Sequence, residues 1–218
     1  VMNIILGSIS IKILASVLGP TGFGLYSFLR QIQLTALLTA AGSQNALVQG
    51  GASQEGQARQ AYLQTVLLLT LFASCIIALG LILLAPWLAR HVIGRSDSTT
   101  IWAVRLLSLP VFTCVLVAFA NGVQNIYREL GQMALAQTVG ALISVLIAYP
   151  VARLVHQGQV GFLPLWMLSI PLCSLATSVL FLWQKGRLTQ LLTNLRAGYD
   201  RGAMQYFLRF AGVSTLTT

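Results

Sequence analysis

No charged residue occurs in AYLQTVLLLTLFASCIIALGLILLAPWL (Ala61–Leu88), a run dominated by leucine, isoleucine and alanine. At about 1.5 Å of rise per helical residue, such a run can cross a hydrocarbon core of about 30 Å. Three further uncharged runs are long enough to do the same. These are Leu106–Tyr127, Leu130–Ala152 and Gly158–Gln184. The repetition predicts an all-α integral membrane protein.

The bulk composition agrees with this prediction and narrows the possible partners. Hydrophobic residues make up 56% of the chain and charged residues 8%, well below the roughly 25% usual for soluble domains. The net charge of +9 arises from basic residues between the apolar runs, where they set topology and contact lipid head groups. We therefore expect membrane lipids as partners and no nucleic acid. The three cysteines lie in different apolar runs, which indicates helix packing rather than a disulfide or metal site.

Six membrane-spanning helices and the start of a seventh are predicted. Gly19-Pro20 ends the first helix, and the short turn after it predicts an antiparallel hairpin. Pro110 is expected to kink the fourth helix. Residues 1–184 then form one transmembrane lobe, residues 185–205 a basic link, and residues 206–218 a truncated seventh helix. The six expected helices are Met2–Leu18, Phe23–Val48, Ala61–Leu88, Thr100–Tyr127, Gln132–Leu154 and Gly161–Gln184.

Basic residues are distributed unevenly over the two sets of links. The links after the second, fourth and sixth helices hold six, and those after the first, third and fifth hold three. The positive-inside rule places the richer set, the link 185–205 and the N-terminus in the cytoplasm. The richer set is Arg59, Arg128, Lys185, Arg187, Arg196 and Arg201, against Arg90, Arg95 and Arg153.

Acidic residues are restricted to the links, at Glu55, Asp97, Glu129 and Asp200. No carboxylate pair is predicted at membrane depth, so the sequence offers neither a general acid–base pair nor an acidic ion relay. No nucleotide, zinc or serine-hydrolase motif is present. We expect a protein that is not an enzyme and that uses no cofactor.

Two cations fall inside predicted helices, Lys12 in the first and Arg30 in the second. A charged group in a membrane helix is costly and usually faces a cavity or a partner. Because no acidic partner occurs in these helices, the two cations predict a water-filled vestibule for an anionic substrate. The alternative is that both side chains snorkel to the interface.

Carboxamides form two further groups of candidate residues. The second helix also carries Thr35 and Thr39, which share a stripe with Gln31 at a spacing of four residues. A polar stripe in lipid must face protein or water, so it lines a cavity or forms hydrogen bonds between helices. The end of the fourth helix predicts a gate or a head-group site at the cytoplasmic mouth. The candidates are Gln31, Gln44 and Asn45 in the second helix, and Asn121, Gln124 and Asn125 in the fourth.

Two segments resemble a known family. IKILASVLGPTGFGLYSFLRQIQLTALLTAAGSQNALVQ (Ile11–Gln49) and ANGVQNIYRELGQMALAQTVGALIS (Ala120–Ser144) are similar to the bacterial polysaccharide (O-antigen-type) flippases. These flippases belong to the multidrug/oligosaccharidyl-lipid/polysaccharide exporter superfamily. The resemblance implies one lobe of a two-lobe exporter in the bacterial inner membrane. It also implies alternating access to an undecaprenyl-pyrophosphate-linked oligosaccharide, as in lipopolysaccharide assembly.

The resemblance gives the candidate residues a role. Basic residues of the cavity, Lys12 and Arg30 here, are expected to hold the pyrophosphate or acidic sugars. Other proteins of envelope polysaccharide assembly are expected partners. Two alternatives stay open: a sibling transporter (a peptidoglycan-precursor flippase or a drug exporter), and a polytopic glycan polymerase or ligase. The absence of membrane carboxylates disfavours a drug exporter, and the absence of a large periplasmic loop disfavours the enzymes.

Overall fold

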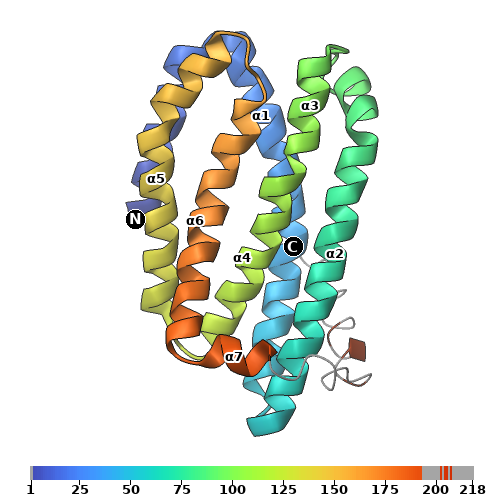
Figure 1. The fold of residues 1–218 in the computed structure, drawn as a ribbon, viewed down its shortest axis with the longest axis vertical. Helices are drawn as coiled ribbons and strands as arrows, with labels where there is room; N and C mark the ends of the chain where they lie inside the picture. The colour runs from blue at the N-terminus through green and yellow to red at the C-terminus, as the bar shows by residue number, and fades with distance from the viewer. Residues whose placement is uncertain (1, 193–201, 203, 206, 208–218) are drawn as a thin grey trace.

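The computed structural model describes residues 2–192, 202, 204–205 and 207, and its regular structure over these residues is helical (Figure 1). This confirms the all-α prediction. The predicted seventh helix and most of the link 185–205 lie outside the described residues. The helices are α1 (Met2–Ala52), α2 (Gly56–His91), α3 (Ser98–Leu106), α4 (Ser108–Ile126), α5 (Leu130–His156), α6 (Phe162–Gln184) and α7 (Arg187–Leu192).

Helix α1 combines the first two predicted helices. Its backbone turns at Gly19, where φ is 65° and ψ is −177°, a conformation essentially restricted to glycine. Pro20 then begins the second arm, at a position where its missing N–H costs no hydrogen bond. Figure 1 shows the first arm rising to the upper end and the second arm descending. The predicted hairpin is present, although helical structure is continuous through the turn.

The predicted fourth helix is divided into α3 and α4 at Leu107. The cause is Pro110, whose ring cannot donate a backbone hydrogen bond and would clash with the carbonyl group of Leu106 in a continuous helix. α3 ends at Leu106 for this reason. The expected kink is therefore present at the expected proline.

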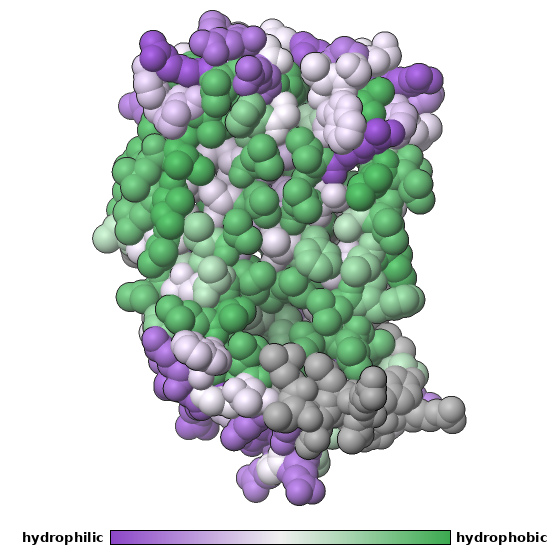
Figure 2. All heavy atoms as spheres, in the orientation of Figure 1, coloured by the Kyte–Doolittle hydropathy of each residue, from purple (hydrophilic) through white to green (hydrophobic). Residues whose placement is uncertain are grey.

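The exterior of the bundle is apolar in the middle and polar at both ends (Figure 2). Among the described residues, five helical segments are long and apolar enough to cross a membrane, with the α1 hairpin counted as one of them. The two arms of α1, α2, the α3–α4 pair, α5 and α6 correspond to the six predicted spans.

A stripe of small residues lets α5 approach α6 closely. The stripe is buried, and its members follow one another at intervals of four residues. A Cβ atom on Gly140 would lie 2.6 Å from the carbonyl oxygen of Ile170 in α6, so only glycine fits there. The Trp166 indole N–H of α6 donates to the Ser144 carbonyl group at 3.0 Å. Small residues promote helix association in membranes because they permit such contact. The stripe is Ala136, Gly140, Ser144, Ala148 and Ala152.

The links lie at two opposite ends of the bundle. One end, at the bottom of Figure 1, holds the α1–α2, α4–α5 and α6–α7 connections. There Glu129 forms ion pairs with Lys185 at 2.8 Å and Arg187 at 2.6 Å, and the Arg187 guanidinium lies 3.7 Å from the centre of the Tyr127 ring. The link expected at 185–205 thus begins with the short helix α7, which this cluster fixes to the α4–α5 turn. The cytoplasmic assignment of this end stays a prediction.

Asp97 caps α3 at the opposite end of the bundle. Its carboxylate accepts hydrogen bonds from the hydroxyl groups of Thr99 and Thr100 and from the Thr100 N–H at 3.0 Å. These hydrogen bonds, above all the one from the Thr99 hydroxyl, lower the pKa of Asp97 from its ordinary 3.8 to about 2. An N-cap of this kind fixes the start of the helix.

Candidate functional site

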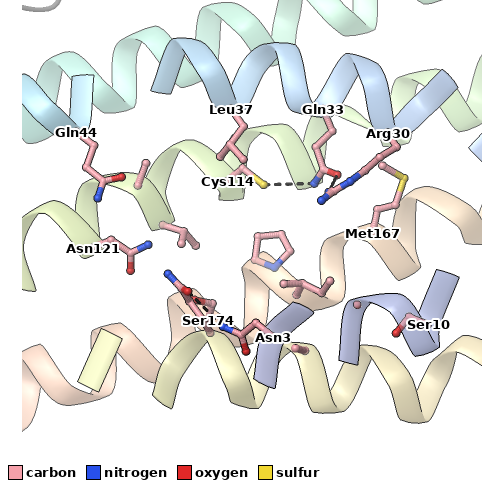
Figure 3. A pocket seen from close by; sticks show the side chains of 17 residues that line it. Asn3, Ser10, Arg30, Gln33, Leu37, Gln44, Cys114, Asn121, Met167 and Ser174 are labelled. Atoms are coloured by element: carbon pink, nitrogen blue, oxygen red, sulfur yellow. Dashed lines mark hydrogen bonds between the residues drawn. The ribbon is translucent and has the colours of Figure 1, made fainter. Parts of the chain in front are cut away.

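A cavity of about 490 Å³ lies within the bundle, between the two arms of α1 and the facing sides of α4, α5 and α6 (Figure 3). Its volume falls in the range of about 300–1,000 Å³ that is typical of small-molecule sites. Arg30 is the one charged side chain among the described residues that line it. The polar lining is Asn3, Ser10, Arg30, Gln33, Gln44, Cys114, Asn121, Gln137 and Ser174.

Arg30 marks one end of the cavity, which we call the cationic end. Its guanidinium donates to Gln33 Oε1 at 2.6 Å, and Gln33 Nε2 donates to the Cys114 sulfur atom at 3.3 Å. Figure 3 shows these three side chains on one wall, with Met167 next to Arg30 and Ser10 on the opposite wall. Gln33 is neutral, so this hydrogen bond orients the guanidinium without cancelling its charge. The cationic end can therefore bind an anion.

The other end holds carboxamides and a hydroxyl group, and we call it the carboxamide end. It consists of Asn3, Gln44, Asn121, Gln137 and Ser174. Asn3 Nδ2 donates to Gln137 Oε1 at 3.4 Å, which joins the first arm of α1 to α5. Figure 3 shows Gln44 and Asn121 at the far end from Arg30, and Asn3 and Ser174 on the opposite wall. These uncharged groups can both donate and accept hydrogen bonds.

Helical spacing explains how the second arm of α1 lines the cavity. Arg30, Gln33, Leu37 and Gln44 are separated by three, four and seven residues, so they share one face of the helix. Gln31 is exposed and belongs to the opposite stripe. The residues that line the cavity therefore lie on a different face of the helix from the polar stripe that contains Gln31 and was noted in the sequence.

The structure brings together three of the eight predicted site residues. Arg30, Gln44 and Asn121 line the cavity. The other five lie elsewhere: Lys12, Gln31 and Asn45 are exposed on α1, Asn125 is half-buried, and Gln124 is fully buried outside the cavity. A substrate-binding role for all eight residues stays a prediction.

Sequence reasoning missed six polar residues of the cavity. Gln33 could have been found, because it follows Arg30 by three residues and must share its face. Asn3 and Ser10 lie in the first arm of α1, whose facing direction depends on the turn at Gly19. The others needed the packing of α4, α5 and α6. The six are Asn3, Ser10, Gln33, Cys114, Gln137 and Ser174.

Comparisons with known proteins agree with this architecture. The family model described as "Polysaccharide biosynthesis protein" matches residues 1–154. A search of curated proteins found no match. The fold is similar to that of a MOP superfamily transporter from Pyrococcus furiosus Vc1 (DSM3638), reported with a binding pocket whose reverse polarity suggests a different function. The TM-score is 0.71 at 20% identity, over 99% of this chain and 50% of that transporter. This chain thus spans about half the length of that protein.

Proposed function

This chain belongs to the family of polysaccharide biosynthesis proteins, and on that premise we propose that it forms one lobe of a flippase. The substrate is an undecaprenyl-pyrophosphate-linked oligosaccharide of the O-antigen type. The protein moves this lipid from the cytoplasmic to the periplasmic leaflet of the bacterial inner membrane by alternating access. Its N-terminus lies in the cytoplasm.

Arg30 is the observation that carries this proposal. It lies at membrane depth in the second arm of α1 and lines a cavity without a carboxylate among the described lining residues. A cation at this depth is costly on insertion, so it needs an anion or water. The pyrophosphate of a lipid-linked sugar supplies that anion, and a cavity of low dielectric strengthens the attraction.

The exposed face of α1 supports a passage beside this lobe. Ser8, Lys12 and Ser16 follow one another at intervals of four residues on the first arm, and all three are exposed. Ser27, Gln31 and Thr35 do the same on the second arm. The first arm of α1 also exposes large apolar residues, such as Ile4 and Ile9. The central turns of α2, α5 and α6 expose large apolar residues such as Phe72, Leu146 and Leu172 without a comparable polar stripe. Because a polar face is unsuited to lipid, we place the second lobe and a water-filled passage against α1.

Transport in proteoliposomes tests the proposal. The full-length protein is reconstituted with a fluorescent polyprenyl-pyrophosphate oligosaccharide, and the fraction of substrate accessible from outside is followed over time. We expect wild type to flip the lipid, Arg30→Gln to abolish flipping, and Arg30→Lys to retain part of it, because lysine keeps the charge without the planar fork. Lys12→Gln is expected to slow flipping.

The matched control is Arg153→Gln, which removes an exposed cation at the end of α5 next to Tyr149. This variant should flip the lipid as wild type does. Equal flipping by wild type and Arg30→Gln, at equal amounts of folded protein, would place the anion site elsewhere. Absence of flipping by wild type would favour a sibling transporter or an enzyme of envelope assembly.

A further inference from the structure

The two ends of the cavity differ in chemistry and lie at different depths. Cys114 and Asn121 are seven residues apart on α4, and Met167 and Ser174 are seven apart on α6. Seven helical residues correspond to about 10 Å. The cationic end and the carboxamide end are thus separated by about 10 Å along α4 and α6, and Arg30 and Gln44 lie about 21 Å apart along α1. A ligand that spans both ends must be charged at one end only.

Two polar atoms of the carboxamide end have no hydrogen-bond partner within the described part of the chain. They are Asn121 Oδ1 and Ser174 Oγ. Asn121 is 7% exposed and Ser174 is 2% exposed, and both line the cavity. A buried polar atom without a partner destabilises a protein, so a ligand that supplies a partner gains affinity. The carboxamide end is therefore prepared for a polar ligand.

We infer that the carboxamide end is a binding site for the hydroxyl groups of one sugar unit, held at Asn121 and Ser174. A sugar hydroxyl both donates and accepts, so it can donate to Asn121 Oδ1 and accept from the Ser174 hydroxyl. A phosphate oxygen can only accept and would face the Asn121 oxygen unfavourably. An acyl chain would leave both atoms without a partner. Of the three parts of a lipid-linked glycan, the sugar is thus the one that satisfies this end.

This inference rests on the proposed function in one respect, because the pyrophosphate at Arg30 fixes which sugar reaches the carboxamide end. That sugar is one of those nearest to the pyrophosphate, since the two ends lie only about 10 to 21 Å apart along the bundle. The remaining sugars of the oligosaccharide must lie outside this cavity.

Binding of three probes to the full-length protein in nanodiscs separates the two ends. The probes are a polyprenyl pyrophosphate, the same lipid carrying one hexose, and the neutral detergent octyl hexoside. We expect wild type to bind the hexosyl lipid about tenfold more tightly than the bare lipid, a ratio that corresponds to one or two added hydrogen bonds. Asn121→Leu should abolish this preference and weaken octyl hexoside binding about tenfold, and Ser174→Ala should do the same to a smaller degree.

Thr113→Val is the matched control, because the Thr113 hydroxyl of α4 donates to the backbone carbonyl groups of Leu109 and Pro110 and Thr113 does not line the cavity. It should leave all three affinities unchanged. Arg30→Gln should weaken both pyrophosphate lipids at least about tenfold and leave octyl hexoside binding unchanged. Thermal unfolding of each variant verifies that it is folded.

The outcomes distinguish the two proposals. Equal binding of the bare and hexosyl lipids by wild type would overturn the sugar site and leave the anion site intact. Binding of octyl hexoside without either pyrophosphate lipid would support the sugar site and overturn the proposed role of Arg30. A preference for the hexosyl lipid that survives in Asn121→Leu and Ser174→Ala would also overturn the sugar site.

Discussion

Replacing Gly140 by alanine tests how closely α5 approaches α6. The added methyl carbon would lie 2.6 Å from the Ile170 carbonyl oxygen and 3.4 Å from the Ile170 Cα and carbonyl carbon atoms. An ordinary contact begins at 3.4 Å, so the overlap with the oxygen is about 0.8 Å. The Ile170 carbonyl oxygen cannot rotate away from the new methyl group, because it belongs to the backbone of α6. The two helices must therefore separate.

The cost of this separation can be estimated from two opposing contributions. Overpacking of a close interface costs typically about 1–3 kcal/mol. Alanine recovers up to about 1 kcal/mol, because it favours the helix over glycine. We therefore expect Gly140→Ala to lower the free energy of unfolding by about 1–2 kcal/mol. Weaker sugar binding should accompany it, since Ala141 and Ile170 line the cavity beside this contact.

Unfolding in mixed micelles by titration with dodecyl sulfate measures this free energy. Gly80→Ala is the matched control, because a Cβ atom on Gly80 in α2 would meet nothing within 4 Å. That variant should be unchanged or more stable by up to about 1 kcal/mol. A Gly140→Ala protein as stable as Gly80→Ala would refute the close approach of α5 to α6.

Three further changes test other parts of the fold. The Asp97 cap should stabilise α3 fully above pH 3.8 and lose its contribution as the pH falls towards about 2, because hydrogen bonds from the adjacent threonine hydroxyls lower its folded-state pKa. Asp97→Asn should remove this acid dependence of stability. Unfolding measured from about pH 2 to about pH 5, a range that includes both pKa values, checks this result. Tyr62→Phe should cost about 0.5–1.5 kcal/mol in the same micelle titration, because the buried hydroxyl donates to the Ala46 carbonyl group at 2.9 Å. Glu129→Gln should raise amide hydrogen exchange in α7 about fivefold, because it weakens the ion pairs with Lys185 and Arg187. Unchanged exchange would mean that the stacking of Arg187 on Tyr127 suffices to fix α7.

The spans were predictable because their length and apolar character are local properties of the sequence. The exact ends of the helices were less predictable, and the pair Gly50-Gly51 shows why. The second predicted helix ends at Val48, just before these two glycines, yet α1 continues to Ala52. A Cβ atom on Gly50 would lie 2.3 Å from the Tyr62 ring, and one on Gly51 would lie 2.4 Å from Ile126. The glycines are needed for packing against α2 and α4, which no local pattern reveals.

The cavity was predictable in part, for a different physical reason. Depth along a helix can be counted in the sequence, so Arg30 could be recognised as a cation at membrane depth. The face that a residue presents depends on the neighbouring helices, and Gln31 was therefore chosen in place of Gln33. Nothing in the sequence shows that α5 and α6 pack closely enough to place Gln137 and Ser174 in the same cavity as Arg30.

Hydrogen-bond satisfaction and contact with the cavity together separate structural polar groups from candidate binding groups among the described residues. Both criteria are needed, because Gln124, Ser144 and Ser178 also have buried atoms without a partner in this part of the chain but do not line the cavity. The Tyr62 hydroxyl is fully buried and donates to a backbone carbonyl group, and the Thr65 hydroxyl donates within its own helix. These hydroxyl groups have their hydrogen bonds satisfied within the protein, so a structural role explains why they occur in an apolar bundle.

Asn121 Oδ1 and Ser174 Oγ are also buried but have no hydrogen-bond partner within the described part of the chain, and both residues line the cavity. If they were merely structural, replacing them by apolar residues would cost stability. We expect the opposite: Asn121→Leu should raise the unfolding temperature of the ligand-free protein while it removes the preference for the hexosyl lipid.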